Sequence, residues 1–207
     1  VFYETRRAIM FENEKIDMRV KYTREWTFEA LYKLLQDNKL GDIKISKIIE
    51  KAGISRATFY RNFTSKEDIV KLKVDAFYHD FYNDVLVDFI KNDPEDEQYL
   101  IQAFFKRVDE EDKLIDTVIK CNLEYMMIEG IYAIITNFRE LFYSRVRTSK
   151  RAEDYTMEIV ASSAWTLLSR WHKTGKVESP SLLSKIYTSV FRNVYYAIFK
   201  DRSLVGD

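Results

Sequence analysis

Apolar residues recur at helical spacing along most of this chain, and the pattern is clearest in its N-terminal third. Across 45–52, isoleucines and one alanine follow the i, i+3, i+4, i+7 spacing that places them on one buried face of a helix. A longer helix is predicted before it, over 23–38. Its expected apolar stripe comprises Trp26, Ala30, Leu31, Leu34 and Leu35.

Turn and capping residues then separate the segment 45–52 from a short third helix. Gly53 directly follows the last periodic residue, where a left-handed C-cap is typical. Ser55 is a favourable N-cap for a helix that reaches Asn62. Two short helices joined by a tight turn have the helix-turn-helix format.

Helical spacing continues along the rest of the chain. Thr64 and Ser65 both offer an N-cap, and Thr64 with Glu67 has the spacing of a capping box, so a fourth helix is predicted from Lys66 to Ile90. Pro94 suits the first turn of the next helix. Further helices are expected over 94–108, 112–120, 122–146, 151–173 and 181–200. With only 5 Gly and 2 Pro for punctuation, we predict an all-α fold of about nine helices. A three-helix head precedes a larger helical body in this prediction.

The composition limits the kinds of site that the chain can form. The 207 residues are 46% hydrophobic and 32% charged, which is typical of a folded globular protein. The single cysteine, Cys121, excludes an internal disulfide and fits a reducing compartment. With two histidines and no glycine-rich phosphate loop or Gly-x-Ser-x-Gly motif, we expect no metal, no cofactor and no enzyme activity.

No apolar run approaches the about 18 residues of a membrane span. No signal-peptide pattern opens the sequence either. We therefore expect a cytoplasmic protein that does not associate with membranes.

Charge is distributed unevenly although the net charge is zero. Between Met18 and Val74, thirteen Lys and Arg side chains stand against seven Asp and Glu, so the remainder of the chain is acidic. The cations nearest the predicted turn are Lys44, Lys47, Lys51, Arg56, Arg61 and Lys66. A basic first part suggests an anionic partner there.

The third helix divides into two faces. Phe59 and Phe63 fall on one side, with Ile54 at the turn, so these three are expected in the core. The remaining positions carry groups that can approach bases or phosphates, and they are Arg56, Ala57, Thr58, Tyr60, Arg61 and Asn62. Lys66 could hold a phosphate at the start of the next helix. Ordinary amphipathic helices also expose Arg and Asn to water, so the face alone leaves both readings open.

The stretch "IKISKIIEKAGISRATFYRNFTSKEDIV", residues 43–70, resembles the helix-turn-helix of the TetR (tetracycline-repressor) family of transcription regulators. Shared features are the Ile-rich helix, Ala-Gly-Ile at the turn, the serine cap, aromatic-Tyr-x-x-Phe and Ser-Lys-Glu. The resemblance implies that the outward set named above faces double-stranded DNA and that Lys66 holds a phosphate. Lys44 departs from the Thr or Ser usual in the family, so a lysine–phosphate contact is expected there, and Ser46 is the next candidate on that helix.

The C-terminal body resembles the family more weakly. The resemblance lies in "SRWHKTGKVESPSLLSKIY", residues 169–187. In relatives the last two long helices form a homodimer, which implies the same role for 151–173 and 181–200. The candidate interface residues are Ile159, Trp165, Leu168, Ile186, Val190 and Val194.

The resemblance also implies a small-molecule effector pocket inside the body. Its candidate lining residues are Tyr125, Met126, Tyr132 and Trp165. Plain core packing is the alternative reading for each of them.

The predicted function is a sequence-specific DNA-binding transcription regulator, a repressor that a small molecule releases from a palindromic operator. Residues 18–66 form the DNA-binding domain in this prediction, and 67–207 the ligand-binding and dimerisation domain. Residues 1–17 are an N-terminal extension whose role the sequence does not define. The alternative is a ligand- or protein-binding module, an activator or co-regulator whose head has lost specific operator reading.

Overall fold

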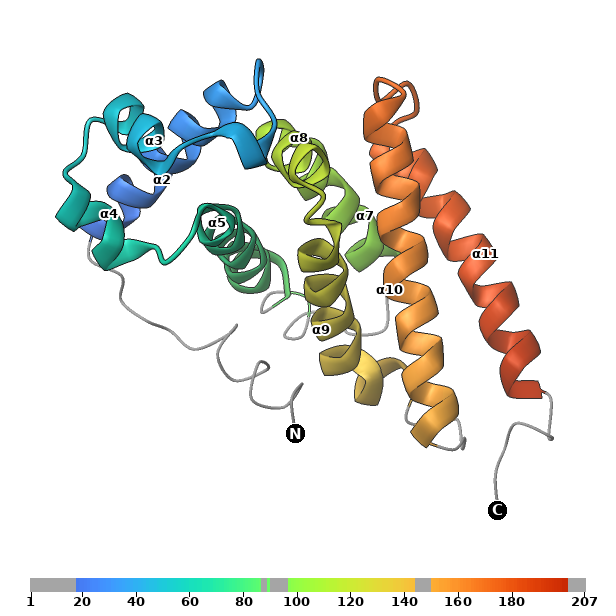
Figure 1. Cartoon of the computed structure of the whole chain (residues 1–207). Helices are drawn as coiled ribbons and strands as arrows, with labels where there is room; N and C mark the ends of the chain where they lie inside the picture. The colour runs from blue at the N-terminus through green and yellow to red at the C-terminus, as the bar shows by residue number, and fades with distance from the viewer. Residues whose placement is uncertain (1–17, 87–88, 90–96, 144–149, 201–207) are drawn as a thin grey trace. The chain divides into compact units, whose positions relative to one another are not determined.

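The computed structural model is helical throughout the residues that it describes, which are 18–86, 89, 97–143 and 150–200 (Figure 1). Within them, nine α-helices occur and no strand: α2 (Met18–Leu34), α3 (Ile45–Ala52), α4 (Arg56–Asn62), α5 (Lys66–Phe81), α7 (Glu97–Asp109), α8 (Asp112–Cys121), α9 (Glu124–Tyr143), α10 (Lys150–Lys173) and α11 (Pro180–Lys200). A 3-10 turn, η1 (Leu40–Asp42), precedes α3, and a π-helical turn, η2 (Tyr82–Leu86), follows α5. The all-α prediction is confirmed, whereas the extension 1–17 and the predicted Pro94 cap lie outside the described residues.

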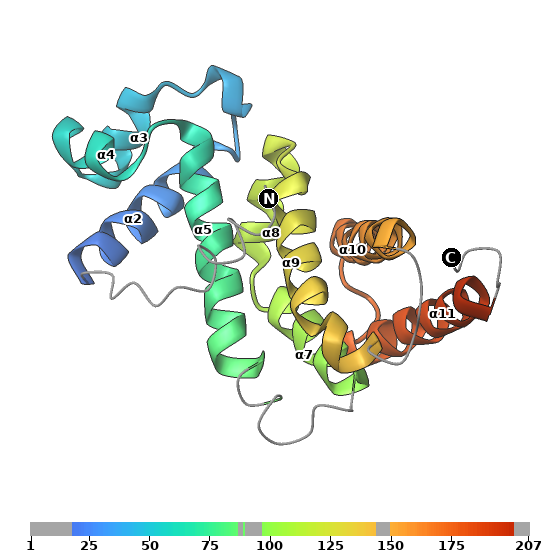
Figure 2. The same cartoon turned by 90° about the horizontal axis from the view of Figure 1, so that it is seen from below.

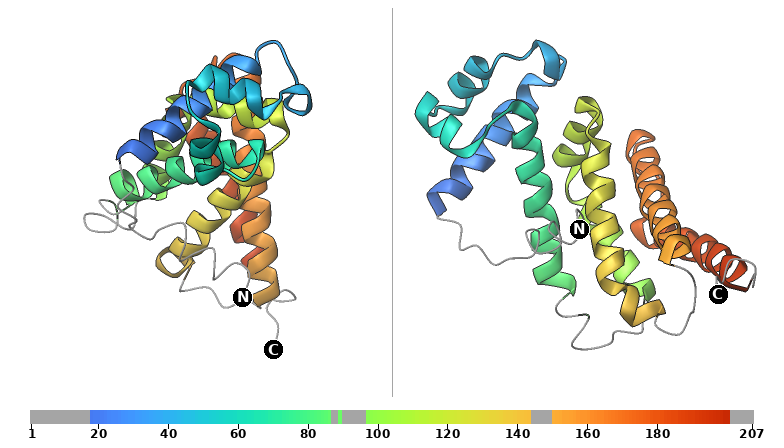
Figure 3. Two further views of the ribbon diagram at one scale, coloured as in Figure 1. Left: turned by 60° about the vertical axis from the view of Figure 1, so that its left-hand side comes forward. Right: turned by 60° about the horizontal axis from the view of Figure 1, so that its bottom comes forward.

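Contacts divide the chain into two compact units. In the described residues, the first unit contains 18–80 and 113–126, and the second contains 81–112 and the chain from Met127 onward. Figures 2 and 3 follow the same helices from other sides. Most of α8 therefore packs with the helix-turn-helix, and the predicted boundary after residue 66 stays a prediction.

The core of the first unit is built where the apolar faces of α2, α3, α4 and α5 meet. Its most deeply buried side chains include Phe28, Leu31, Ile48, Phe59, Phe63, Val70 and Tyr78. Burial of each such side chain contributes about 1.5–3 kcal/mol to the free energy of unfolding. Of the three side chains expected in the core, Phe59 and Phe63 are buried, with ring centroids 5.2 Å apart, whereas Ile54 is only half-buried.

The predicted stripe of α2 is wrong in one position. Trp26 is 57% exposed and stacks on Tyr22, with ring centroids 6.0 Å apart. The buried side chains of the helix are Thr27, Phe28, Ala30 and Leu31. Trp26 stands two residues before Phe28, which is about 200° around the helix at 3.6 residues per turn, so it faces away from the core.

The short helices begin and end where their caps predict, with one shift. Gly53 ends α3 in the left-handed region at φ 66°, as expected. The predicted capping box of Thr64 and Glu67 is wrong, because the cap lies one residue later. The Asp68 backbone N–H donates to Ser65 Oγ at 3.2 Å, and the Asp68 carboxylate accepts from the Thr64 N–H at 2.8 Å. Burial opposes ionisation of Asp68, but its carboxylate accepts hydrogen bonds from the Thr64 hydroxyl and from the backbone N–H groups of Thr64 and Ser65, and these keep the pKa of the carboxyl below the ordinary value.

In the second unit, α11 contacts α7 and α10 through both apolar and polar side chains. The Tyr187 ring packs against Phe105 with centroids 5.8 Å apart, and its hydroxyl donates to the Val160 carbonyl at 2.7 Å. In the link between α10 and α11, the Trp171 indole N–H donates to the Glu178 carbonyl at 2.9 Å. These contacts fix the two last helices against each other.

Candidate nucleic-acid interface

The position of α4 follows from its two ends. Gly53 adopts a backbone conformation that side chains with a Cβ rarely take, so α3 can turn sharply into the next segment. Ser55 then caps α4, and its Oγ accepts from the Thr58 N–H at 3.1 Å. Phe59 is fully buried on the inner side, whereas Tyr60, the next residue, is 57% exposed. The packing of one side therefore holds the other side toward solvent.

The outward side of α4 is rich in hydrogen-bond donors. Arg56, Ala57, Tyr60 and Arg61 are all exposed. Within the described part of the chain, neither guanidinium takes part in an ion pair or hydrogen bond. Each offers five N–H donors in a planar fork, which matches a phosphate or the O6/N7 edge of guanine. Small Ala57 between them permits close approach to a groove.

Thr58 and Asn62 are partly engaged inside the helix. The hydroxyls of Thr58 and Ser55 lie 2.9 Å apart in a hydrogen bond. The Asn62 amide donates to the Thr58 carbonyl at 2.8 Å. One N–H and the amide oxygen of Asn62 remain, which is the pair that an adenine edge requires. Both residues are half-buried, so they are second to the arginines in access.

The N-terminus of α3 presents a second polar surface. Lys44 occupies the N-cap position, is exposed, and makes no side-chain capping bond. Ser46 in the first turn is also exposed. First-turn amides point outward from a helix and favour anions, and an adjacent ammonium strengthens that preference. The loss of a Thr or Ser cap at Lys44 is thus compatible with a phosphate contact.

Lys66 differs from the other candidates because its ammonium is directed into the protein. It donates to the carbonyls of Gly41 at 3.3 Å and Ile43 at 2.9 Å, and also to that of Leu40. Three N–H donors thus meet three carbonyls at the turn before α3. A phosphate contact by Lys66 stays a prediction, and the structure supplies these carbonyls as competing partners.

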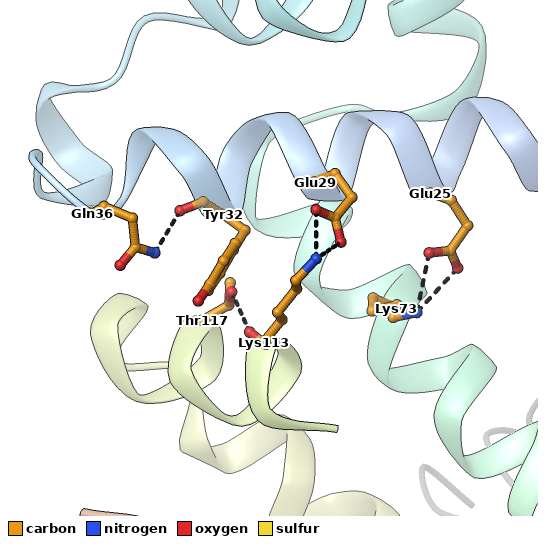
Figure 4. Close-up of polar contacts among 7 residues, drawn as sticks. All are labelled: Glu25, Glu29, Tyr32, Gln36, Lys73, Lys113 and Thr117. Atoms are coloured by element: carbon orange, nitrogen blue, oxygen red, sulfur yellow. Dashed lines mark hydrogen bonds and ion pairs between the residues drawn. The ribbon is translucent and has the colours of Figure 1, made fainter. Parts of the chain in front are cut away.

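Sequence reasoning missed a row of polar contacts that fastens α2 to α5 and α8 (Figure 4). Lys73 binds both carboxylate oxygens of Glu25 at 3.1 Å. Lys113 binds those of Glu29 at 2.6 and 2.8 Å and lies 5.6 Å from the Tyr32 ring centroid. The hydrogen bond that Lys113 donates to Glu29 raises the pKa of the Lys113 ammonium. No local pattern could reveal these pairs, since their members are far apart in sequence.

The candidate effector residues divide between the units. In the first unit Met126 is buried and Tyr125 is 51% exposed; in the second, Trp165 is buried and Tyr132 is half-buried. The effector pocket therefore stays a prediction. A shallow depression of about 400 Å³ lies between α2 and α3. It is lined by Trp26, Glu29, Ala30, Lys33, Lys51, Ala52 and Gly53.

The candidate dimer residues fall into two groups. Ile159, Ile186 and Val190 are 55%, 45% and 59% exposed, whereas Trp165 and Leu168 are buried within the single chain and have little surface left for a partner. The side chain of Val194 lies outside the described ones.

Two further exposed apolar residues extend this surface and were missed by the sequence reasoning. Tyr155 on α10 is 70% exposed and Leu182 on α11 is 47% exposed. Their spacing of four residues from Ile159 and Ile186 was the available signal.

Membrane spans and metal sites are both absent from the described residues. No helix in this part of the chain is both long and apolar enough to span a bilayer. No group of three His, Cys, Asp or Glu side chains in the same residues is placed to hold a metal ion.

Comparison with known proteins confirms the resemblance. Residues 29–72 match the model of the bacterial regulatory proteins of the tetR family. The fold is that of Lin0861 from Listeria innocua, which is 15% identical and has a TM-score of 0.72 over 89% of this chain and 97% of that one. A TetR transcriptional regulator from Streptococcus agalactiae 2603V is 19% identical, with a TM-score of 0.55 over 84% and 96%.

The dihydroxyacetone kinase operon activator DhaS is also 19% identical, with a TM-score of 0.55 over 86% of this chain and 96% of that one. No curated protein matches the sequence.

Proposed function

Because this chain carries a TetR-family N-terminal domain at residues 29–72, we propose that it is a homodimeric, sequence-specific DNA-binding transcription regulator. α4 enters the major groove in this proposal. The observation that carries it is the division of α4, whose buried Phe59 and Phe63 aim exposed Arg56 and Arg61 outward. A polyanion is the partner that this arrangement fits.

Each residue of the interface has a role in the proposal. Arg56 and Arg61 read guanine edges or hold phosphates, and Ala57 allows the approach of the helix. The Tyr60 hydroxyl reaches the DNA backbone while its ring packs edge-on against Phe59, with centroids 5.3 Å apart. Lys44 and the first-turn amides of α3 hold a neighbouring phosphate.

A dimer places two such helices on one operator. Exposed apolar residues on α10 and α11, namely Tyr155, Ile159, Leu182, Ile186 and Val190, form the proposed interface. Since a two-fold dimer repeats each head about one DNA turn away, the operator is expected to be palindromic with half-sites about 34–36 Å apart.

The regulatory step in the proposal is a shift between two populations. A small molecule bound in the body favours a spacing of the two heads that no longer fits the operator, which makes the protein a repressor. The chain first passes from one unit to the other at the end of α5, so α5 is the element proposed to carry this change.

Selection of bound sequences from a random DNA pool tests the proposal. The expected result is a palindrome whose affinity exceeds that of random DNA at every salt concentration. A helix-turn-helix that has lost specific reading would bind DNA through electrostatic attraction alone. Its affinity and its salt dependence would then be equal for operator and random DNA. That outcome would favour the alternative, a ligand- or protein-binding module.

Activation is the second candidate for the direction of regulation. One protein with this fold is described as the dihydroxyacetone kinase operon activator DhaS, so activation also occurs on this fold. A reporter fused to the selected operator separates the two directions. Deletion of the gene raises transcription if the protein is a repressor and lowers it if the protein is an activator.

A further inference from the structure

We infer that Lys66 is a positioning residue that ties the start of α5 to the turn before α3, and that it does not hold a DNA phosphate. The inference rests on the proposed function and goes beyond it. It assigns to Lys66 a role different from the phosphate contact that the family resemblance implies.

The geometry around the ammonium carries the inference. Lys66 Nζ donates to the carbonyls of Gly41, Ile43 and Leu40, which lie 23 to 26 positions away in sequence. An ammonium has three N–H donors, and all three are accounted for by these acceptors. The side chain is half-buried, so it does not project freely toward a partner.

The turn that Lys66 holds sits directly before the proposed phosphate site. Its own backbone bonds run from Asp42 N to the Lys39 carbonyl at 3.0 Å and from Ile43 N to the Leu40 carbonyl at 3.3 Å. The next residue, Lys44, is the N-cap of α3. Lys66 therefore fixes where α3 begins relative to α5, and α3 carries α4 through its tight turn.

Lys66 and Lys44 differ in how far their side chains are exposed to solvent. The Lys44 side chain is exposed and makes no capping hydrogen bond, so its charge is available to an anion. A phosphate contact by Lys66 would require it to give up at least one carbonyl that water would then have to satisfy. Of the two lysines, Lys44 is thus the phosphate contact and Lys66 sets its position.

Hydrogen exchange without DNA tests the positioning role independently of any regulator activity. In Lys66→Met, which keeps the aliphatic stem, the amides of Asp42 and Ile43 should exchange about ten-fold faster or more, because the turn opens locally. The matched control Lys44→Met should leave both rates unchanged. Unchanged exchange in Lys66→Met would overturn the inference even if the protein binds its operator normally.

Salt titration of operator binding is the second readout. Removal of a phosphate contact lowers the slope of log K against log salt by about 0.9, whereas removal of a positioning residue leaves the slope as in the wild type. Lys66→Met should keep the slope but reduce the preference for operator over random DNA by about ten-fold. A slope lowered by about 0.9 in Lys66→Met would assign the phosphate to Lys66 and overturn the inference.

Lys66→Arg keeps the charge and serves if the methionine variant folds poorly. A planar guanidinium does not converge on three carbonyls as a compact ammonium does, so exchange of the Asp42 and Ile43 amides should stay fast. Recovery of full operator affinity by arginine with exchange still fast would show that charge at the DNA matters, which contradicts the inference. If no operator is found at all, the exchange result still decides the role of Lys66.

Discussion

α4 and α11 each bury one side and expose the other, but the two exposed sides have opposite chemistry. α4 exposes Arg56 and Arg61 beside the exposed ring of Tyr60. α11 exposes Leu182, Ile186 and Val190, which recur every four residues, while Tyr187 between them is buried. Both helices are positioned by aromatic side chains on the inner side. The outer side then specifies what kind of partner each can bind.

The difference predicts unequal responses to salt. A cationic face loses affinity for DNA as salt rises, since binding releases counterions from the duplex. Two apolar faces associate because nonpolar area is removed from water, which contributes roughly 25 cal/mol per Å² of buried area. Salt weakens this association little. In a salt titration of the same protein, DNA affinity should therefore fall much more steeply than dimer stability.

The largest effect is expected from a charge placed on the apolar face of α11. Ile186→Glu should convert the dimer to a monomer, because a carboxylate would be buried without a partner. Operator affinity should then fall by about 10²–10⁴-fold, as the second head no longer binds within the same complex. Sedimentation gives the oligomeric state and a DNA titration gives the affinity. Lys185→Glu adds a carboxylate one residue away and off the stripe, and it should stay dimeric; a dimeric Ile186→Glu would remove α11 from the interface.

The second effect is on the cationic face. Arg61→Ala should weaken operator binding by about 1–3 kcal/mol, which is roughly 5- to 150-fold, and relax the preference for one base position. The dimer should remain intact, in contrast to the α11 variant. Lys47→Ala is the matched control, since Lys47 is paired with Glu50 at 2.9 Å on the neighbouring helix. Equal losses in the two variants would mean that only net charge matters and that α4 does not read bases.

The helix-turn-helix was predictable because its signals are local. A glycine that must adopt positive φ, a serine cap and an i, i+3, i+4, i+7 stripe each act over a few residues. Consequently α3 and α4 begin and end where the sequence indicates. The outward face of α4 follows from the same local pattern, because Phe59 and Phe63 determine which side is buried.

Features that depend on distant partners were not predictable. Trp26 looked like core by type, but the phase of α2 is set by packing of Phe28 against other helices. The carbonyls that accept hydrogen bonds from Lys66 belong to a turn more than twenty residues earlier, so the sequence alone did not reveal them. Trp165 looked like interface or pocket, and its burial depends on how the body helices pack.

A smaller effect is expected on the buried side of α11. Tyr187→Phe removes the hydroxyl bond to the Val160 carbonyl and should lower the free energy of unfolding by about 0.5–1.5 kcal/mol at pH 7. Burial raises the pKa of Tyr187 to about 12, although the hydrogen bond with Ser163 acts in the opposite direction. Urea denaturation of both proteins measures the difference.

The wild-type protein and Tyr187→Phe should also differ in how their stability changes in alkaline solution. The unfolded tyrosine loses its proton near pH 10, whereas the folded one keeps it to about pH 12, so stability from Tyr187 is lost as pH rises between these values. Wild-type protein should therefore lose more stability than Tyr187→Phe above about pH 10. Cys121, whose pKa burial raises to about 11, titrates in both proteins and cancels in the comparison. Parallel pH profiles would mean that the Tyr187 hydroxyl is accessible to water.

The smallest effect concerns the ion pairs that hold α2, and it sharpens the contrast between packing and charge. Lys113→Met and Glu29→Gln should each lower the free energy of unfolding by about 0.2–1 kcal/mol, because the pair is largely exposed to solvent. A double-mutant cycle in urea isolates the coupling between the two, and this coupling should shrink as salt is added. Lys120→Met, which removes a hydrogen bond to Gln36 at 2.8 Å instead of an ion pair, is the control and should show little salt dependence. A coupling that persists in high salt would mean that the hydrogen bonds between Lys113 and Glu29, which salt screens little, contribute more than the attraction of the two charges.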